Sequence, residues 1–395
     1  MAPLLDSRFQ GSEHTIYWRD TITAECADGG RLPEKLNEAR VSAPGRLCLF
    51  GEHQDYLGLP VVALAISLRV AIEGRRRRDG LVRVDLPDVS SSIEFRIDEP
   101  PRHGGAADFF RAGANVLRRE GLSFSTGFDC SVRGGIPPRA GTASSSAMVV
   151  GWIVFLARMS DGARELFPAE AARLAYAAEV LELGGAGGMM DQFAAAYGGA
   201  SAISFDPAPD VEQLEAPRGA FVLGDSREPK DTQAVLSRVK DAILDVSRRL
   251  AARHAGFSLR ETPLEDLGRY AGELSRAELD LLGAVLANRD VTRGGIGLFR
   301  GGRLDDRALG TLLDEQQILL REVLGVSTPK IDRMLDAALR AGALGGKING
   351  SGGGGCMFAY APDRFREVAE AIERAGGTAY VVRADGGVRI EEAAA

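Results

Sequence analysis

The sequence predicts an α+β protein of two domains, and three observations support that prediction. Its 395 residues exceed what one ordinary hydrophobic core organises. Residues 43–132 are mostly strand-like, with short apolar runs separated by polar turns. The second half is rich in helices with strands interleaved among them, which is typical of an α+β domain. A boundary near residue 215 divides the chain into domains of residues 1–215 and 216–395.

The composition is that of a globular protein, with 45% apolar and 26% charged residues. The formal net charge is 48 − 55 = −7, which argues against a nucleic-acid surface because neutralising phosphates requires clustered positive charge. The four cysteines are far apart and form no CxxC pair, which favours reduced thiols over zinc or disulfides. The first twenty residues lack a signal-peptide core, and no apolar run approaches the roughly 20 residues that cross a bilayer. We therefore expect a soluble, cytoplasmic protein without a nucleic-acid or membrane partner; the oligomeric state stays open.

Residues 1–40 are mixed and polar, and we expect a helical or irregular lead-in. Strands follow at 46–51 (RLCLFG), 60–74, 81–86, 92–97 and 128–132. The run GRRRRDG at 74–80 lies between two of them, so it predicts a solvated hairpin turn rather than a nucleic-acid site. Residues 144–159 predict a buried apolar helix opened by serines. Residues 168–183 predict an amphipathic helix that begins with proline.

The second half begins with a strand at 219–226 (GAFVLGDS) and continues with helical patterns at 235–256, 264–288, 305–323 and 328–342. The glycine-rich stretch GGKINGSGGGGC at 345–356 leads into the apolar strand CMFAY. A helix at 363–375 and a strand from residue 378 close the pattern.

The first segment with unusual chemistry is SAPGRLCLFGEHQDYLG, at 42–58. Glu52, His53 and Asp55 crowd a turn between Gly51 and Gly58, directly after an apolar strand. Such a cluster offers several hydrogen-bonding groups to a hydroxyl-bearing ligand. A salt-bridged structural turn is the alternative. A metal site at the histidine is disfavoured because the other three histidines stand in unrelated contexts.

The second segment, GGIPPRAGTASSSAMVVG at 134–151, leads into the predicted buried helix. Backbone N–H groups at a helix N-terminus suit a phosphate, and a serine hydroxyl can ligate magnesium. A capped buried helix without a ligand is the alternative. No segment of the chain matches the GxxxxGK[ST] phosphate loop.

The third segment places six glycines between residues 346 and 355. The match of residues 350–355 to GxGxxG is weak evidence for dinucleotide binding, because an apolar strand follows it rather than a helix. So many glycines indicate a close approach of the backbone to something else. A flexible linker is the alternative.

With these three segments in this order, the chain from about residue 41 to 360 resembles the GHMP kinase superfamily. PGRLCLFGEHQDYLG and the later GGMMDQF at 187–193 resemble the galactokinase branch in particular. The resemblance implies two α+β domains, the second ferredoxin-like, with the active site in the cleft between them. It implies ATP and Mg²⁺ as cofactors, and phosphorylation of a small-molecule hydroxyl. In the galactokinase branch that hydroxyl is the anomeric one of a sugar.

The resemblance also implies roles for individual residues. Asp191 matches the catalytic aspartate, with Arg46 beside it; a helix cap and a surface arginine are the respective alternatives. Glu179 matches a metal ligand together with Ser146, although an exposed helix acid is possible for Glu179. The sugar-binding positions are Glu52, His53, Asp55 and Gly188. The nucleotide-binding positions are Arg139, Ala140, Gly141, Thr142, Ser144, Ser145, Ser146, Gly352 and Gly353.

Three departures from the galactokinase pattern bear on the substrate. Cys48 and Leu57 stand where galactokinases usually have asparagine, which puts galactose itself in doubt. Thr142 replaces a glycine, but its hydroxyl can still serve a phosphate loop. Arg227 and Thr232 fit a substrate-side segment or, nearly as well, a charged surface loop.

The leading hypothesis is therefore an ATP-dependent kinase that makes a sugar 1-phosphate, with a small-molecule sugar and ATP as its partners. Another monosaccharide or a polyol such as inositol would suit the same cluster. A mevalonate-type alcohol is less favoured, because it would not need the Glu-His-x-Asp cluster. A non-catalytic sensor of sugar and ATP, and a dinucleotide-binding module, are the alternatives from other classes.

Overall fold

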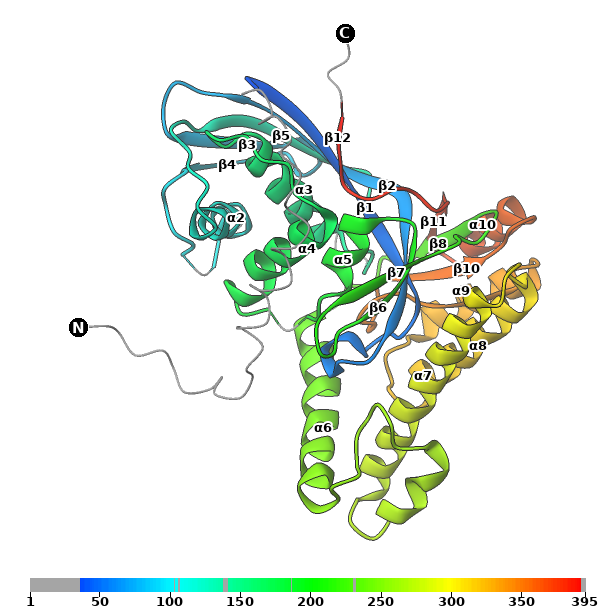
Figure 1. The fold of residues 1–395 in the computed structure, drawn as a ribbon. Helices are drawn as coiled ribbons and strands as arrows, with labels where there is room; N and C mark the ends of the chain where they lie inside the picture. The colour runs from blue at the N-terminus through cyan, green and yellow to red at the C-terminus, as the bar shows by residue number, and fades with distance from the viewer. Residues whose placement is uncertain are drawn as a thin grey trace.

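The computed structural model describes residues 36–391 except 103, 106, 138–140, 186 and 230–231. The chain folds around two β-sheets, and two long helices project from them as a helical arm (Figure 1). The expectation for residues 1–40 lies almost wholly outside the described residues. In the part of the chain that the structure describes, no helix is long and apolar enough to span a membrane.

The first sheet contains all five strands predicted in the N-terminal half. Its strands are β1 (Glu38–Phe50), β2 (Val61–Arg76), β3 (Leu81–Leu86), β4 (Ser91–Arg96), β5 (Phe128–Gly134), β6 (Ala200–Ser204), β7 (Asp210–Leu214) and β12 (Arg389–Glu391), with a 3₁₀ turn η3 (Pro87–Val89) between β3 and β4. The order is β12-β1-β2-β5-β3-β4, and β6 with β7 extends the sheet from β2. β3 and β5 run parallel, and the other pairs are antiparallel.

One connection in this sheet differs from the sequence prediction. The GRRRRDG segment joins β2 to β3, but β5 lies between these strands, so the segment is not a hairpin turn. Arg77 is fixed there by ion pairs with Asp79 at 2.7 Å and Asp129 at 2.6 Å. The strand β12 returns from the C-terminal end of the chain to pair with β1. The domain boundary at residue 215 stays a prediction.

Helices cover one face of the first sheet (Figure 1). They are α2 (Asp108–Arg119), α3 (Ser144–Arg158), α4 (Pro168–Tyr176) and α5 (Met190–Tyr197). α3 lies at their centre and is buried nearly all round, with Trp152 stacked on Phe155 at 5.4 Å between ring centroids. This position explains its uninterrupted apolar sequence. The helix predicted at 168–183 is α4 followed by a π-helical segment, η4 (Ala177–Leu181), which carries Glu179.

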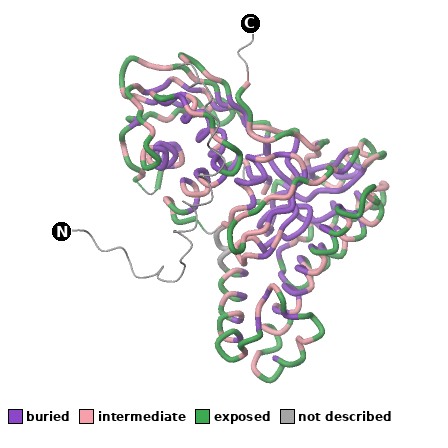
Figure 2. Tube along the Cα trace, in the orientation of Figure 1, coloured by how far each residue is buried: buried purple, intermediate pink, exposed green. Residues whose placement is uncertain are grey.

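The ends of β1 and β2 near residues 47–50 and 61–66 lie between two hydrophobic cores. Cys48 packs with the core under α3, whereas Leu47 and Leu49 pack with a second core that includes Phe221 and Phe358. A strand buried on both faces reads as a continuous apolar run, as RLCLF does. Figure 2 shows the buried chain concentrated where the two sheets approach each other.

The second sheet confirms the ferredoxin-like expectation for the C-terminal part. Its strands are β8 (Phe221–Asp225), β9 (Gly345–Ile348), β10 (Cys356–Tyr360) and β11 (Thr378–Val382). They are antiparallel in the order β11-β8-β10-β9, which is the split βαβ arrangement of that fold. Helices α9 (Pro329–Arg340) and α10 (Phe365–Arg374) pack against it, and α8 (Asp306–Glu322) adjoins β9.

The helical arm consists of α6 (Thr232–Arg253), η5 (Leu264–Tyr270) and α7 (Arg276–Arg300). The helix predicted at 264–288 is wrong in its bounds, because residues 264–270 form a 3₁₀ turn and α7 begins only at Arg276. Ser275 and Glu278 form a capping box that starts the helix, with Ser275 N donating to Glu278 Oε2 at 2.7 Å. A small separate core holds the arm together and also includes Leu59 from the end of the turn after β1.

Candidate active site

The three segments singled out in the sequence meet at one buried side chain, Asn349. Its Oδ1 accepts from Cys48 N at 2.9 Å, and its Nδ2 donates to the carbonyls of Gly141 (2.9 Å) and Arg46 (3.3 Å). These contacts join the strand before the polar turn (residues 51–59), the serine loop (residues 141–146) and the glycine loop (residues 349–355). Asn349 was not predicted from the sequence, although it lies inside the glycine-rich motif GGKINGSGGGGC.

Asp191 and Arg46, which the resemblance places beside each other, form an ion pair. Arg46 Nε and Nη2 each lie 2.8 Å from Asp191 Oδ1, and Nη1 donates to Gly141 O at 2.7 Å. Burial alone would lower the pKa of Arg46, but the charges of Asp191 and Glu52 outweigh it and raise that pKa. The Asp191 side chain is 30% exposed, in the first turn of α5. It is therefore oriented by a fixed cation yet open to a ligand.

Asp55 is the second carboxylate of the site. It begins the short 3₁₀ turn η2 (Asp55–Leu57) and accepts from Tyr56 N at 2.9 Å and from Met190 N at 3.3 Å. Burial and the nearby charge of Asp191 raise its pKa to about 6. Gly188 makes this approach possible, because a Cβ at that position would lie 2.2 Å from Asp55 Oδ2.

Glu52 is fully buried and paired with Lys347 of β9. Lys347 Nζ donates to Glu52 Oε1 at 3.1 Å and to the carbonyls of Cys48 (2.8 Å) and Ile348 (3.0 Å). The same Glu52 oxygen accepts from Gly350 N at 2.7 Å. This carboxylate therefore fastens the polar turn to the glycine loop; a contact with a ligand stays a prediction. Lys347 was not predicted from the sequence either.

His53 links the same two segments. Its Nε2 lies 3.0 Å from Ser351 O and its Nδ1 lies 2.9 Å from Tyr56 Oη. Burial lowers its pKa, so we assign a neutral ring in which Nε2–H donates to Ser351 and Nδ1 accepts from Tyr56. Within the described residues, no three His, Cys, Asp or Glu side chains gather as a metal-binding group.

Ser146, Glu179 and Gln192 come together behind the serine loop. Gln192 Nε2 donates to Glu179 Oε2 at 2.6 Å, and the hydroxyls of Ser145 and Ser146 also hydrogen-bond to Glu179. Burial raises the pKa of Glu179, and these hydrogen bonds oppose the rise. Gln192 Oε1 and Thr142 Oγ1 are buried without a hydrogen-bond partner. A carboxylate and hydroxyls are the hard oxygen donors that Mg²⁺ takes beside substrate phosphates, so the donor set fits that ion.

The serine loop turns sharply into α3. Gly141 (φ 85°) and Ala143 (φ 60°) are both left-handed, and Ala143 is the N-cap of the helix. Arg46 N donates to Thr142 O at 3.1 Å, which ties the loop to β1. The N-terminus of α3 therefore lies beside Asp191 and Arg46. A helix N-terminus stabilises an anion. The predicted contacts Arg139 and Ala140 lie outside the described residues.

The glycine loop is not a linker, because it connects the paired strands β9 and β10. Gly350 and Gly352–Gly355 all have φ between 72° and 117°. A Cβ at Gly350 would lie 2.7 Å from Gly141 O, and one at Gly352 would lie 2.5 Å from Val326 O. These glycines therefore allow close backbone packing. Nucleotide contacts by Gly352 and Gly353 stay a prediction.

Four further positions from the sequence analysis are Cys48, Leu57, Arg227 and Thr232. Cys48 is buried and its thiol donates to Phe50 O at 3.2 Å, so it faces the core. Leu57 packs against the core of the helical arm. Arg227 Nε donates to Thr378 Oγ1 at 2.6 Å, at the start of β11. The backbone of Thr232 begins α6.

Comparison with known proteins shows a consistent family likeness. The GHMP kinases N terminal domain matches residues 107–199, the GHMP kinases C terminal domain residues 302–378, and the galactokinase galactose-binding signature residues 33–76. The mevalonate kinase of Thermococcus onnurineus is 30% identical over 361 residues, which cover 89% of this chain and 98% of that protein. The galactokinase of Streptomyces coelicolor is 30% identical over 324 residues, covering 80% and 82%. The crystal structure of Lactococcus lactis galactokinase complexed with galactose superposes with a TM-score of 0.78 at 22% identity, covering 90% of this chain and 96% of that one.

Proposed function

Because this chain belongs to the GHMP kinases, we propose that it transfers a phosphoryl group from ATP to the anomeric hydroxyl of a monosaccharide. The observation that carries this proposal is the pair of carboxylates, Asp55 and Asp191, beside a turn that matches the galactose-binding signature. Adjacent carboxylates accept hydrogen bonds from neighbouring hydroxyls, which a sugar ring supplies.

Asp191 is the proposed catalytic residue. Phosphoryl transfer requires an in-line hydroxyl, a group that accepts its proton, and positive charge around the transferring phosphate. Asp191 accepts the hydroxyl proton, and Arg46 at 2.8 Å holds its carboxylate in place. Arg46 also donates to Gly141 O. The same arginine therefore contacts both Asp191 and the serine loop, which supports a fixed distance between them.

ATP and magnesium fit the serine loop. The N-terminus of α3 offers backbone N–H groups to the phosphates, and Ser146 with Glu179 would hold the ion. Bound magnesium neutralises charge on the phosphates during the transfer. The pKa of Glu179, raised by burial, would fall when a cation replaces the hydrogen bonds that it accepts now.

A mevalonate-type alcohol is the second candidate, since a mevalonate kinase is 30% identical over most of this chain. Such an acceptor carries its own carboxylate, which Asp55 and Asp191 would repel unless a cation offset them. Arg46 is already engaged by Asp191. The charge around the site therefore favours an uncharged, hydroxyl-rich acceptor.

The test is an ADP-release assay with MgATP across neutral monosaccharides, inositols and mevalonate. We expect turnover with one monosaccharide, and a loss of at least about 100-fold in kcat for Asp191→Asn, the range that removal of a general base produces. Asp336→Asn, an exposed position on α9, is the matched control and should behave as wild type. Turnover with mevalonate alone would overturn the sugar assignment, and no loss in Asp191→Asn would overturn the role of Asp191.

A further inference from the structure

The helical arm covers the polar turn that carries the proposed acceptor-binding residues. Leu57 and Leu59 of the turn pack into the core of the arm, together with Ile243 and Val246 of α6 and Leu286 of α7. Leu59 is fully buried there. The turn therefore has one end in the first sheet and the other in the arm.

Polar contacts from α7 reach the same turn. Asn288 Nδ2 donates to Glu52 O at 2.9 Å. With the Gln54 amide assigned the orientation that satisfies both of its ends, its oxygen accepts from Arg289 N at 2.7 Å and its nitrogen donates to Pro60 O at 3.1 Å. These contacts are buried and hold the first half of the turn.

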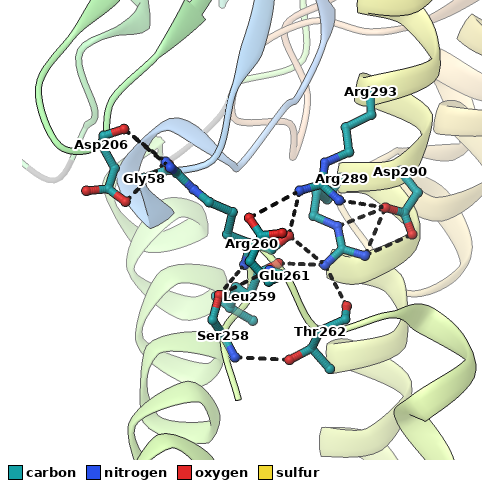
Figure 3. A network of polar contacts seen from close by, with 10 residues as sticks. All are labelled: Gly58, Asp206, Ser258, Leu259, Arg260, Glu261, Thr262, Arg289, Asp290 and Arg293. Carbon is teal, nitrogen blue, oxygen red and sulfur yellow. Dashed lines mark hydrogen bonds and ion pairs between the residues drawn. The ribbon is translucent and has the colours of Figure 1, made fainter. Parts of the chain in front are cut away.

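Arg260 holds the second half. It lies in the loop between α6 and η5, and its Nη2 donates to Gly58 O and Asp206 O, both at 3.3 Å (Figure 3). Nη2 also lies 3.2 Å from the Asp206 carboxylate. One guanidinium thus joins the end of the polar turn to the loop after β6.

The backbone of Arg260 is itself fixed by two arginines of α7 (Figure 3). Arg289, fully buried, donates from Nη1 to the carbonyls of Leu259 (2.8 Å) and Thr262 (2.7 Å). Arg293 Nη2 donates to Arg260 O at 2.7 Å. Asp290 balances the buried charge, with Arg289 Nε and Nη2 each 2.9 Å from a carboxylate oxygen. Arg260 therefore reaches the turn from a rigid support.

We propose that Arg260 is a positioning residue for the acceptor, acting through the polar turn. The inference rests on the proposed function, in which Asp55 of that turn binds the acceptor beside Asp191. Releasing Gly58 lets the turn move, and small misplacements of a binding group are costly because productive geometry is narrow. The serine loop makes no contact with Arg260 among its described hydrogen bonds, so ATP binding is unaffected.

The test compares Arg260→Met and Arg260→Lys with Arg269→Met, in the full-length protein. Arg269 is the matched control, because it lies on the same arm but pairs with Asp266 in η5 at 2.9 Å. With the monosaccharide that the wild type phosphorylates, we expect Arg260→Met to raise the acceptor KM about 10-fold. We expect kcat and the KM for ATP to stay within about twofold, and Arg260→Lys to recover part of the loss because it keeps one donor.

Hydrogen–deuterium exchange supplies a readout that does not depend on the acceptor. Peptides over residues 52–59 should exchange faster in Arg260→Met than in wild type or Arg269→Met, with peptides over α3 unchanged. An unchanged acceptor KM together with unchanged exchange would overturn the proposal. An equal rise in the KM for ATP would overturn it too, because it would indicate a general structural role. If the wild type phosphorylates no sugar, the proposed function fails, whereas the exchange comparison still decides whether Arg260 holds the turn.

Discussion

Asp55 is a residue of the site whose pKa is raised toward neutral pH. Burial and the charge of Asp191 raise its pKa to about 6. The ionised carboxylate accepts hydrogen bonds from acceptor hydroxyls, whereas the protonated acid loses part of that capacity. We therefore expect kcat/KM for the acceptor to rise with pH through a midpoint near 6. The measurement is a kcat/KM profile from about pH 5 to about pH 8 at saturating MgATP.

In the ligand-free protein, the contribution of Asp55 to stability changes with pH in the opposite direction, so it falls as the pH rises. Because the folded-state pKa of Asp55 is raised, its contribution to the unfolding free energy is fully present below the ordinary value of 3.8 and is lost as pH rises through about 6. Asp55→Asn is the control for both measurements, since it removes the titrating group. A wild-type profile that is flat across the range would contradict the assignment.

Glycine is needed at position 188 because a side chain there would collide with Asp55, and not because the backbone adopts a conformation that only glycine favours. A methyl group there would lie 2.2 Å from Asp55 Oδ2, so Gly188→Ala must displace that carboxylate. We expect the acceptor KM to rise about 10-fold or more, with little change in the KM for ATP. Gly187→Ala is a matched control, because a Cβ at Gly187 would meet no atom within 4 Å. Equal effects of the two substitutions on steady-state kinetics would refute this explanation.

At the scale of single residues, a functional side chain could be predicted only where one sequence motif reveals its chemistry. Arg46 and Asp55 stand in the motif PGRLCLFGEHQDYLG and Asp191 stands in GGMMDQF, and the structure brings the three together. Lys347 and Asn349 were missed because their roles are buried contacts with β1, about 300 residues earlier in the chain. A lysine and an asparagine inside the glycine-rich stretch GGKINGSGGGG were the available signal.

At the scale of elements, a prediction succeeded where one apolar run corresponds to one helix and failed where apolar spacing continued across a break between two elements. α3 agrees with its predicted range because its apolar character is continuous. The helix predicted at 264–288 failed because apolar residues recur with similar spacing through the 3₁₀ turn η5 and into α7. The S-x-x-E capping box at Ser275 and Glu278 was the signal that marks the true start.

The glycine loop shows how an element can be located from sequence without its role being settled. The density of glycines predicted a close backbone approach, and the approach is to the backbone of Gly141 and Val326. The sequence cannot tell a neighbouring loop from a bound phosphate, because both require the same absence of a side chain.

At the scale of the whole molecule, the fold class was predictable from the order of three motifs, but the way the two sheets join was not. β12 pairs with β1 across more than three hundred residues, and no local pattern encodes that pairing. The apolar runs of β1 and β2 are also consistent with a buried helix or a single core. Their division between two cores follows only from the second sheet packing beneath them.

The core that the two sheets share predicts that the molecule unfolds as one unit. Leu64 of β2 is fully buried in the core to which β1, β2, β8, β10, α7 and α8 contribute, so it lies in a core that both sheets share. We expect Leu64→Ala to lower the unfolding free energy by about 2–5 kcal/mol while calorimetry and circular dichroism still report a single transition. Ile318→Ala, at a half-exposed position on α8, is the control and should change stability little. Two separated transitions, of which Leu64→Ala moves only one, would mean that the shared core does not couple the sheets and that the predicted boundary near residue 215 divides independently folding domains.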